Sequence, residues 1–198
     1  MNLSFSLWRL KFSFSSYLVP NVRVIGIHNL IRETSYRVLF LDYDFMPLSW
    51  VIEEVYFLIS KFKLGDFIIL KSSENSYHAI CIDVLTPRRE NEIVNCSSCD
   101  DAFKNSSSFD FKAKVLRVSQ KGMTNKPEFV DFVRSKFNRN NLKSAGHYQF
   151  FKLHYSIDDW NVERPLFLSR LDELLSGDKQ ILYSVSLINY PTRKNVKG

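Results

Sequence analysis

An apolar run that ends in two acidic residues limits most strongly what this chain can fold into. Residues 38–44 read VLFLDYD, so large apolar side chains give way abruptly to Asp42 and Asp44. The run predicts a buried strand over 36–42. Side chains alternate along a strand, so the two acids are expected on the same face. Neighbouring carboxylates repel each other, so the pair indicates a place where a cation sits between them.

The pattern around this strand predicts an α/β (α+β) fold, with a mixed sheet and packed helices. Pro47 and apolar residues at 3.6-residue spacing predict a helix that runs to about residue 62. Strands are expected at 67–70 and 77–84, on either side of a polar turn. The order strand, helix, strand, strand implies at least one crossover helix.

The rest of the chain has weaker patterns. Further strands are expected at 4–14, 22–27, 112–119, 149–155 and 180–188. Helices are expected at 127–137 and 166–175. Residues 86–92 fit an exposed connection or the start of a helix, and 95–108 fit a short helix and loop.

Length and composition limit the class of protein. The 198 residues, 45% of them hydrophobic, fit one domain over 1–198, or two intimate subdomains. Three cysteines make no disulfide framework, and no uncharged apolar run reaches 18 residues. We therefore expect a cytoplasmic protein with no membrane partner. The net charge of +6 is compatible with a nucleic-acid partner, although a basic surface can also serve solubility alone.

Two further groups of polar residues follow the acidic pair along the chain. Ser76 and His78 lie one residue apart at the start of an expected strand, so they share a face, and both can donate to a triphosphate oxygen. Asp100 and Asp101 form a second acidic position. Carboxylates at two positions can hold divalent metal ions through oxygen.

Arg117 and Lys121 complete the set. They can place fixed positive charge where negative charge accumulates on a phosphoryl group. Acids for metal and donors for triphosphate are the minimum set for nucleotidyl transfer. Each part alone has a plainer interpretation: acids at a strand end often form turns or caps, a histidine in an apolar strand is often structural, and an arginine is usually a surface charge.

In this order the motifs resemble those of archaeo-eukaryotic primases and primase-polymerases. That family has hydrophobic-hydrophobic-Asp-x-Asp/Glu, then Ser-x-His, then hydrophobic-Asp. Here residues 40–44 read FLDYD, 76–78 read SYH and 99–100 read CD. The pair Leu116-Arg117 and the nearby Lys121 are similar to residues that follow the third aspartate in the family. The resemblance covers about residues 36–122, and Asp101 is an alternative to Asp100 as the third acid.

The resemblance implies a small plasmid- or virus-type catalytic core. Its fold would combine an N-terminal α/β unit with an RNA-recognition-motif-like catalytic unit, and it would work in the host cytoplasm if viral. It implies a template-dependent nucleotidyltransferase that makes or extends primers on single-stranded DNA from nucleoside triphosphates, with a replication helicase as a candidate partner.

The resemblance also assigns the roles of the residues. It implies that Mg2+ or Mn2+ is held by Asp42, Asp44 and Asp100, that the triphosphate is held by Ser76 and His78, and that developing charge is neutralised by Arg117 and Lys121. Basic residues that would follow a template backbone are Arg88, Arg89, Arg134, Lys136 and Arg139.

Two alternatives to a polymerase remain. A degenerate domain could bind nucleic acid in plasmid or viral replication without catalysis, through the same basic surface. A metal-dependent nuclease could use the acidic pair, but no Glu-x-Lys motif accompanies the pair on its strand.

Overall fold

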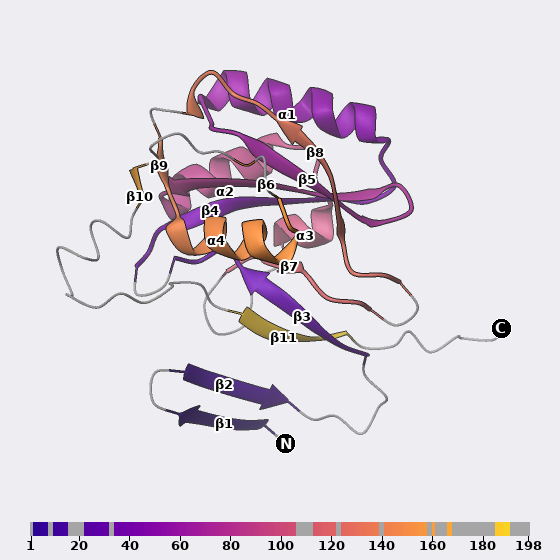
Figure 1. Cartoon of the computed structure of the whole chain (residues 1–198), viewed down its shortest axis with the longest axis vertical. Coiled ribbons are helices and arrows are strands. Elements are labelled where there is room, and N and C mark those ends of the chain that lie inside the picture. The colour runs from indigo at the N-terminus through magenta and orange to yellow at the C-terminus, as the bar shows by residue number, and fades with distance from the viewer. Residues whose placement is uncertain are drawn as a thin grey trace.

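The fold is α+β, with antiparallel sheets and a few helices (Figure 1). A computed structural model describes residues 2–7, 10–15, 22–31, 34–105, 113–121, 124–138, 141–157, 160, 166–167 and 185–190. Among these residues the strands form three sheets. This agrees with the expected class of a sheet with packed helices.

The largest sheet is built around one long central strand, β6, whose two sides are both paired. The strands of this sheet are β4 (Arg37–Tyr43), β5 (Phe67–Ser73), β6 (Ser76–Leu85), β8 (Glu128–Val133), β9 (Leu142–Lys143) and β10 (Leu166–Phe167). β6 is antiparallel to both β4 and β5, and β8 adds to β5. The short β9 pairs with β6 at Asp83 and is parallel to β10.

A crossover helix joins the two strands that flank β6. β4 and β5 are both antiparallel to β6, so they run parallel to each other, and α1 (Leu48–Phe62) connects them. The apolar face of α1 is buried against the sheet through Val51, Val55, Leu58, Ile59 and Phe62. α1 begins after Pro47 and ends at Lys63, which has a positive φ of 53°. The expected strand–helix–strand–strand order of this region is confirmed.

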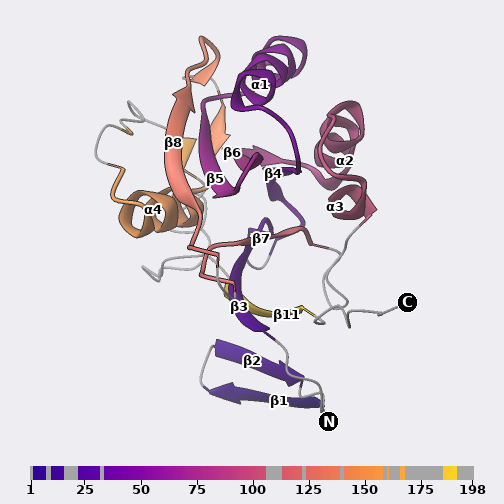
Figure 2. The same cartoon turned by 90° about the vertical axis from the view of Figure 1, so that its right-hand side faces the viewer.

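Helices cover both faces of this sheet, which explains why its strands are apolar on both sides. Figure 2 shows α1, α2 (Pro87–Cys96) and α3 (Asp101–Asn105) on one side of the sheet and α4 (Ala145–His154) on the other. On the α4 side, the Phe40 ring meets the rings of His147 and Phe151 edge to face, at 5.9 and 6.1 Å between centroids. Side chains of β4 that share a face with Phe40 therefore point to the α4 side.

A second sheet lies beside the first. It has the order β11–β3–β7, with β3 (Val22–His28) antiparallel to both β7 (Val115–Arg117) and β11 (Val185–Tyr190). Figure 2 shows β7 between the largest sheet and β3. The N-terminal hairpin of β1 (Asn2–Leu7) and β2 (Leu10–Ser15) replaces the single strand expected over 4–14.

Three expected elements of the second half of the chain differ from the structure, two of them over most of their length. The segment expected to be a helix at 127–137 contains strand β8, whose aromatic and β-branched residues pair with the edge of β5. The segment expected to be a strand at 149–155 lies mostly in α4, where His147 and Phe151 recur four residues apart on the buried face. The expected helix at 166–175 begins with β10 instead, and residues 168–175 lie outside the described residues.

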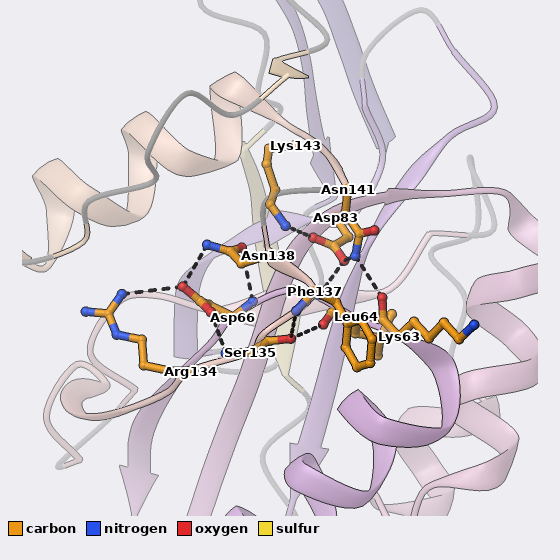
Figure 3. Close-up of polar contacts among 11 residues, drawn as sticks. Lys63, Leu64, Asp66, Asp83, Arg134, Ser135, Phe137, Asn138, Asn141 and Lys143 are labelled. Carbon is orange, nitrogen blue, oxygen red and sulfur yellow. Dashed lines mark hydrogen bonds and ion pairs between the residues drawn. The ribbon is translucent and has the colours of Figure 1, made fainter.

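A cluster of polar side chains connects the segments at the end of the sheet where β5 begins and β6 ends (Figure 3). Lys143 and Asp83 form a buried ion pair, and Asp83 also accepts hydrogen bonds from the Gly65 amide at 2.7 Å and from Asn141 at 2.6 Å. Asp66 accepts bonds from the Ser135 amide and the Asn138 side chain, at 2.7 and 2.9 Å.

The charges of this cluster are satisfied within it, so we interpret it as structural. It joins the loop before β5 to the segment after β8.

Candidate active site

The acidic pair meets the serine–histidine motif where β4 ends and β6 begins. Asp42 is directly opposite His78 in the antiparallel pairing of the two strands. The His78 Nε2 atom lies 3.5 Å from Asp42 Oδ1. Both residues share the face of Phe40, so they point to the α4 side of the sheet. Residues far apart in the chain are therefore in contact.

The third carboxylate is placed next to Asp42 by the backbone. The amide of Asp100 donates to the Asp42 carbonyl oxygen at 2.7 Å. Asp100 Oδ2 accepts from the Phe103 amide at 2.9 Å and so caps the short helix α3. Asp101, the alternative third acid, is exposed and pairs with Lys104 at 3.3 Å. Of the two acids, Asp100 is therefore the one positioned toward the pair.

Asp44 lies just beyond the end of β4, in a turn with an unusual backbone. The next residue, Phe45, has a φ of 56° and is 90% exposed. The amide of Met46 donates to the carbonyl of Asn75 at 2.8 Å, in the turn between β5 and β6. This bond holds the loop that follows Asp44 against the turn that precedes Ser76.

The charges around Asp42 oppose its ionisation. Partial burial, together with the nearby carboxylates of Asp44 and Asp100, raises the pKa of Asp42 to about 7. The positive charges of Arg117 and Lys121 act in the opposite direction but do not offset this. The other two acids and the two bases chosen from the sequence are thus close enough to Asp42 to influence its carboxylate.

His78 is neutral and incompletely hydrogen-bonded. Burial, with a smaller contribution from the Arg117 charge, lowers the pKa of His78 to about 3. Its Nδ1 atom is shielded from solvent and has no hydrogen-bond partner among the described residues. Ser76 is buried two residues earlier, and its hydroxyl donates to the Glu74 carbonyl at 3.5 Å. An unpaired buried nitrogen is costly, so an incoming polar group would be stabilising here.

Arg117 crosses from the second sheet to the first. Its guanidinium donates to the backbone carbonyls of Ser119 and Asn125 at 2.8 and 2.9 Å, and to that of Ser72 in β5. The side chain is buried and holds these segments together. Arg117 therefore has a structural role as well as a positive charge near Asp42, which the sequence did not indicate.

Two residues of this region were missed by the sequence analysis. Tyr155 follows α4 directly, and Arg117 is close enough to affect its pKa. Lys126 places its ammonium 5.6 Å from the centre of the Tyr155 ring and 3.4 Å from the His154 carbonyl. No local pattern indicates these two residues. The contact between Lys126 and Tyr155 depends on how α4 packs, and the sequence predicts a strand at 149–155 instead of this helix.

Two of the basic residues expected to follow a template, Arg89 and Arg134, form ion pairs with acidic side chains. Arg89 lies on α2, on the far side of the sheet, and pairs with Glu92 at 3.0 Å. Arg134 pairs with Asp66 at 3.4 Å, at the opposite end of β5 from the acidic pair. Arg139 lies outside the described residues.

The residues present suit a divalent cation by chemistry. Carboxylate oxygens are the ligands that Mg2+ and Mn2+ prefer, and the raised pKa of Asp42 marks a concentration of negative charge that a cation would relieve. Within the described ranges, however, no three or more Asp, Glu, His and Cys side chains form a group that could hold a metal ion. Metal binding by Asp42, Asp44 and Asp100 thus requires their side chains to converge further.

Comparisons of the chain with models of protein families, with curated proteins and with solved structures find no match. Across the part of the chain that the structure describes, no helix has the length and apolarity needed to cross a membrane.

Proposed function

We propose that the chain is a template-dependent nucleotidyltransferase of the primase-polymerase type, working with Mg2+ or Mn2+. The observation that carries the proposal is the set of groups around Asp42. Separate segments supply them: His78 from β6, Asp100 from the start of α3, and Arg117 and Lys121 from β7 and the segment after it. Such convergence is typical of a site for phosphoryl chemistry.

The topology around these residues supports the same proposal. From β4 to β7 the elements follow the order strand, helix, strand, strand, helix, strand, with a second short helix before β7. β6 lies between the two parallel strands β4 and β5, as in a split β-α-β unit. This order suits the RNA-recognition-motif-like catalytic unit that the sequence resemblance implies.

The roles of the side chains follow from their chemistry. Asp42, Asp44 and Asp100 would hold the cation, which when bound supplies a more acidic attacking hydroxyl and stabilisation of charge during in-line displacement. His78 stays neutral, so its buried ring can form hydrogen bonds without adding charge. Arg117 holds a fixed positive charge in place, because three carbonyl groups restrain its guanidinium.

The test is incorporation of labelled deoxynucleotides and ribonucleotides on a single-stranded DNA template with Mn2+ or Mg2+. We expect incorporation by the unmodified chain and a loss of about 100-fold or more in Asp42→Asn, since a metal ligand contributes several kcal/mol to the transition state. Asp101→Asn is the matched control. Its side chain is exposed and turned to Lys104, so incorporation should be unchanged.

The same incorporation assay also distinguishes the proposed function from the alternative one. One observation bears on the alternative, a non-catalytic nucleic-acid-binding domain. The Arg117 guanidinium donates to backbone carbonyls, so part of its hydrogen-bonding capacity is not available to a phosphoryl group. Salt-dependent binding of single-stranded DNA with no incorporation in either metal would select that alternative. Full activity of Asp42→Asn would rule out the proposed site.

A further inference from the structure

The end of helix α4 lies against the segment that carries Arg117, whose charge affects the pKa of Asp42. The imidazole Nε2 of His154 is 3.1 Å from the carbonyl of Val118, the residue after Arg117, so the end of α4 is attached to the segment that carries Arg117. Tyr155 follows, with its ring stacked on Phe151 at 6.1 Å and 19° between planes. Its position is therefore fixed by contacts on both sides.

The Tyr155 hydroxyl has no hydrogen-bond partner among the described residues, although it is shielded from solvent. Burial raises the pKa of this phenol, against the opposing charge of Arg117, so it carries its proton at physiological pH. A buried hydroxyl without a partner is destabilising, and such groups usually have a water or a ligand as a partner.

The groups near Tyr155 indicate what that partner would be. The positive charge of Arg117 acts to lower the pKa values of Tyr155, His78 and Asp42. The exposed ammonium of Lys126 lies over the Tyr155 ring. Nδ1 of His78 is also shielded and has no hydrogen-bond partner among the described residues. For a neutral hydrogen-bond donor that lies among positive charges, an anionic oxygen is a better partner than a water molecule.

We infer that Tyr155 is a ligand-contacting residue, whose hydroxyl donates a hydrogen bond to a phosphate oxygen of the nucleoside triphosphate, with Lys126 beside it. This inference rests on the proposed function. The hydroxyl is shielded as the chain stands, so a ligand reaches it only after a side chain moves. Lys126 is exposed, and its ammonium lies 5.6 Å from the centre of the ring.

Two tyrosines associated with α4 provide a matched pair of variants. Tyr148 lies in the helix, and its hydroxyl donates to the Trp160 carbonyl at 2.7 Å, whereas the Tyr155 hydroxyl has no such partner. Removing the hydroxyl with Tyr155→Phe should leave the melting temperature unchanged or raise it, because an unsatisfied group is lost. Tyr148→Phe should lower the melting temperature, because a satisfied hydrogen bond is lost.

The experiment is isothermal titration of a nonhydrolysable nucleoside triphosphate, and separately of inorganic triphosphate, in the presence of Mg2+. We expect Tyr155→Phe to weaken the affinity for both ligands roughly tenfold, the scale of one hydrogen bond to a charged acceptor. Tyr148→Phe should bind both as tightly as the unmodified chain.

Each other outcome overturns the inference. Equal affinity in Tyr155→Phe, or equal losses in the two variants, would remove Tyr155 from the ligand site while leaving the proposed function standing. A loss seen with the nucleoside triphosphate but not with inorganic triphosphate would exclude the phosphate contact. If the unmodified chain binds neither ligand, the proposed function and the inference fail together.

Discussion

A carboxylate that has two others as neighbours is costly to keep ionised, and Asp42 is in that position. Its strand neighbour His78 is neutral, so this pair contributes little compensating charge. The site therefore stores unfavourable electrostatic energy when the pH is high and no cation is present. Catalytic groups commonly have such perturbed pKa values, because the environment that serves the reaction is costly to the empty fold.

The stability of Asp42→Asn should depend on pH in a defined way. The pKa of Asp42 is about 7 in the fold against about 3.8 ordinarily, so the folded chain loses stability progressively as the pH rises from about 4 to about 7. The asparagine side chain of the variant carries no charge at any of these pH values. We therefore expect the variant to be more stable than the unmodified chain by roughly 2–4 kcal/mol at pH 8, with a much smaller difference at pH 4.5.

Urea unfolding of both chains at the two pH values measures this difference. The remaining side chains are the same in both chains, so their contributions to the pH dependence largely cancel. A difference that does not change with pH would show that Asp42 has an ordinary pKa.

At the scale of elements, β6 carries different polar groups at its two ends. His78 near its start faces the candidate site, and Asp83 near its end binds Lys143 from β9. The second pair is fully buried and receives further hydrogen bonds from Gly65 and Asn141. A buried pair of this kind is costly to break, because the remaining charge has no water around it.

Lys143→Met should therefore destabilise the fold by about 3–5 kcal/mol, since Asp83 would remain buried without its counter-ion. The free energy of unfolding in urea is the measurement. Lys136→Met is the control, because Lys136 is exposed and only lies near the Phe137 ring, and its cost should stay below about 1 kcal/mol. Equal small effects in the two variants would contradict a structural role for the Asp83–Lys143 pair.

At the scale of the whole molecule, Arg117 connects the two larger sheets. It belongs to β7, which lies beside β3 and pairs with it (Figures 1 and 2). Its side chain donates to the Ser72 carbonyl in β5. A charged residue expected to act on a phosphoryl group thus also holds the scaffold together. Loss of activity in an Arg117 variant would be ambiguous unless its stability were measured as well.

Arg117→Lys tests this connection while keeping the charge. A lysine ammonium cannot reproduce the planar set of donors that reaches carbonyls of three segments, so we expect a loss of about 2–4 kcal/mol in stability. Hydrogen exchange should become faster at Gly26 and Ile27, which are opposite Arg117 and Leu116 in the β3–β7 pairing. Unchanged exchange at β3 would contradict the bridging role.

The sequence alone determined the β4–α1–β5–β6 unit and the positions of Asp42 near the end of β4 and His78 near the start of β6. These features depend on short-range periodicity in long apolar segments, where the 3.6-residue and 2-residue repeats are clear. It did not determine β8 or α4, whose mixed aromatic patterns suit either structure until a neighbouring strand or core selects one. Tertiary structure alone placed Asp100 rather than Asp101 beside Asp42, engaged Arg117 with backbone carbonyls and brought Tyr155 to the region. Those outcomes depend on contacts between residues far apart in the chain, which no local pattern encodes.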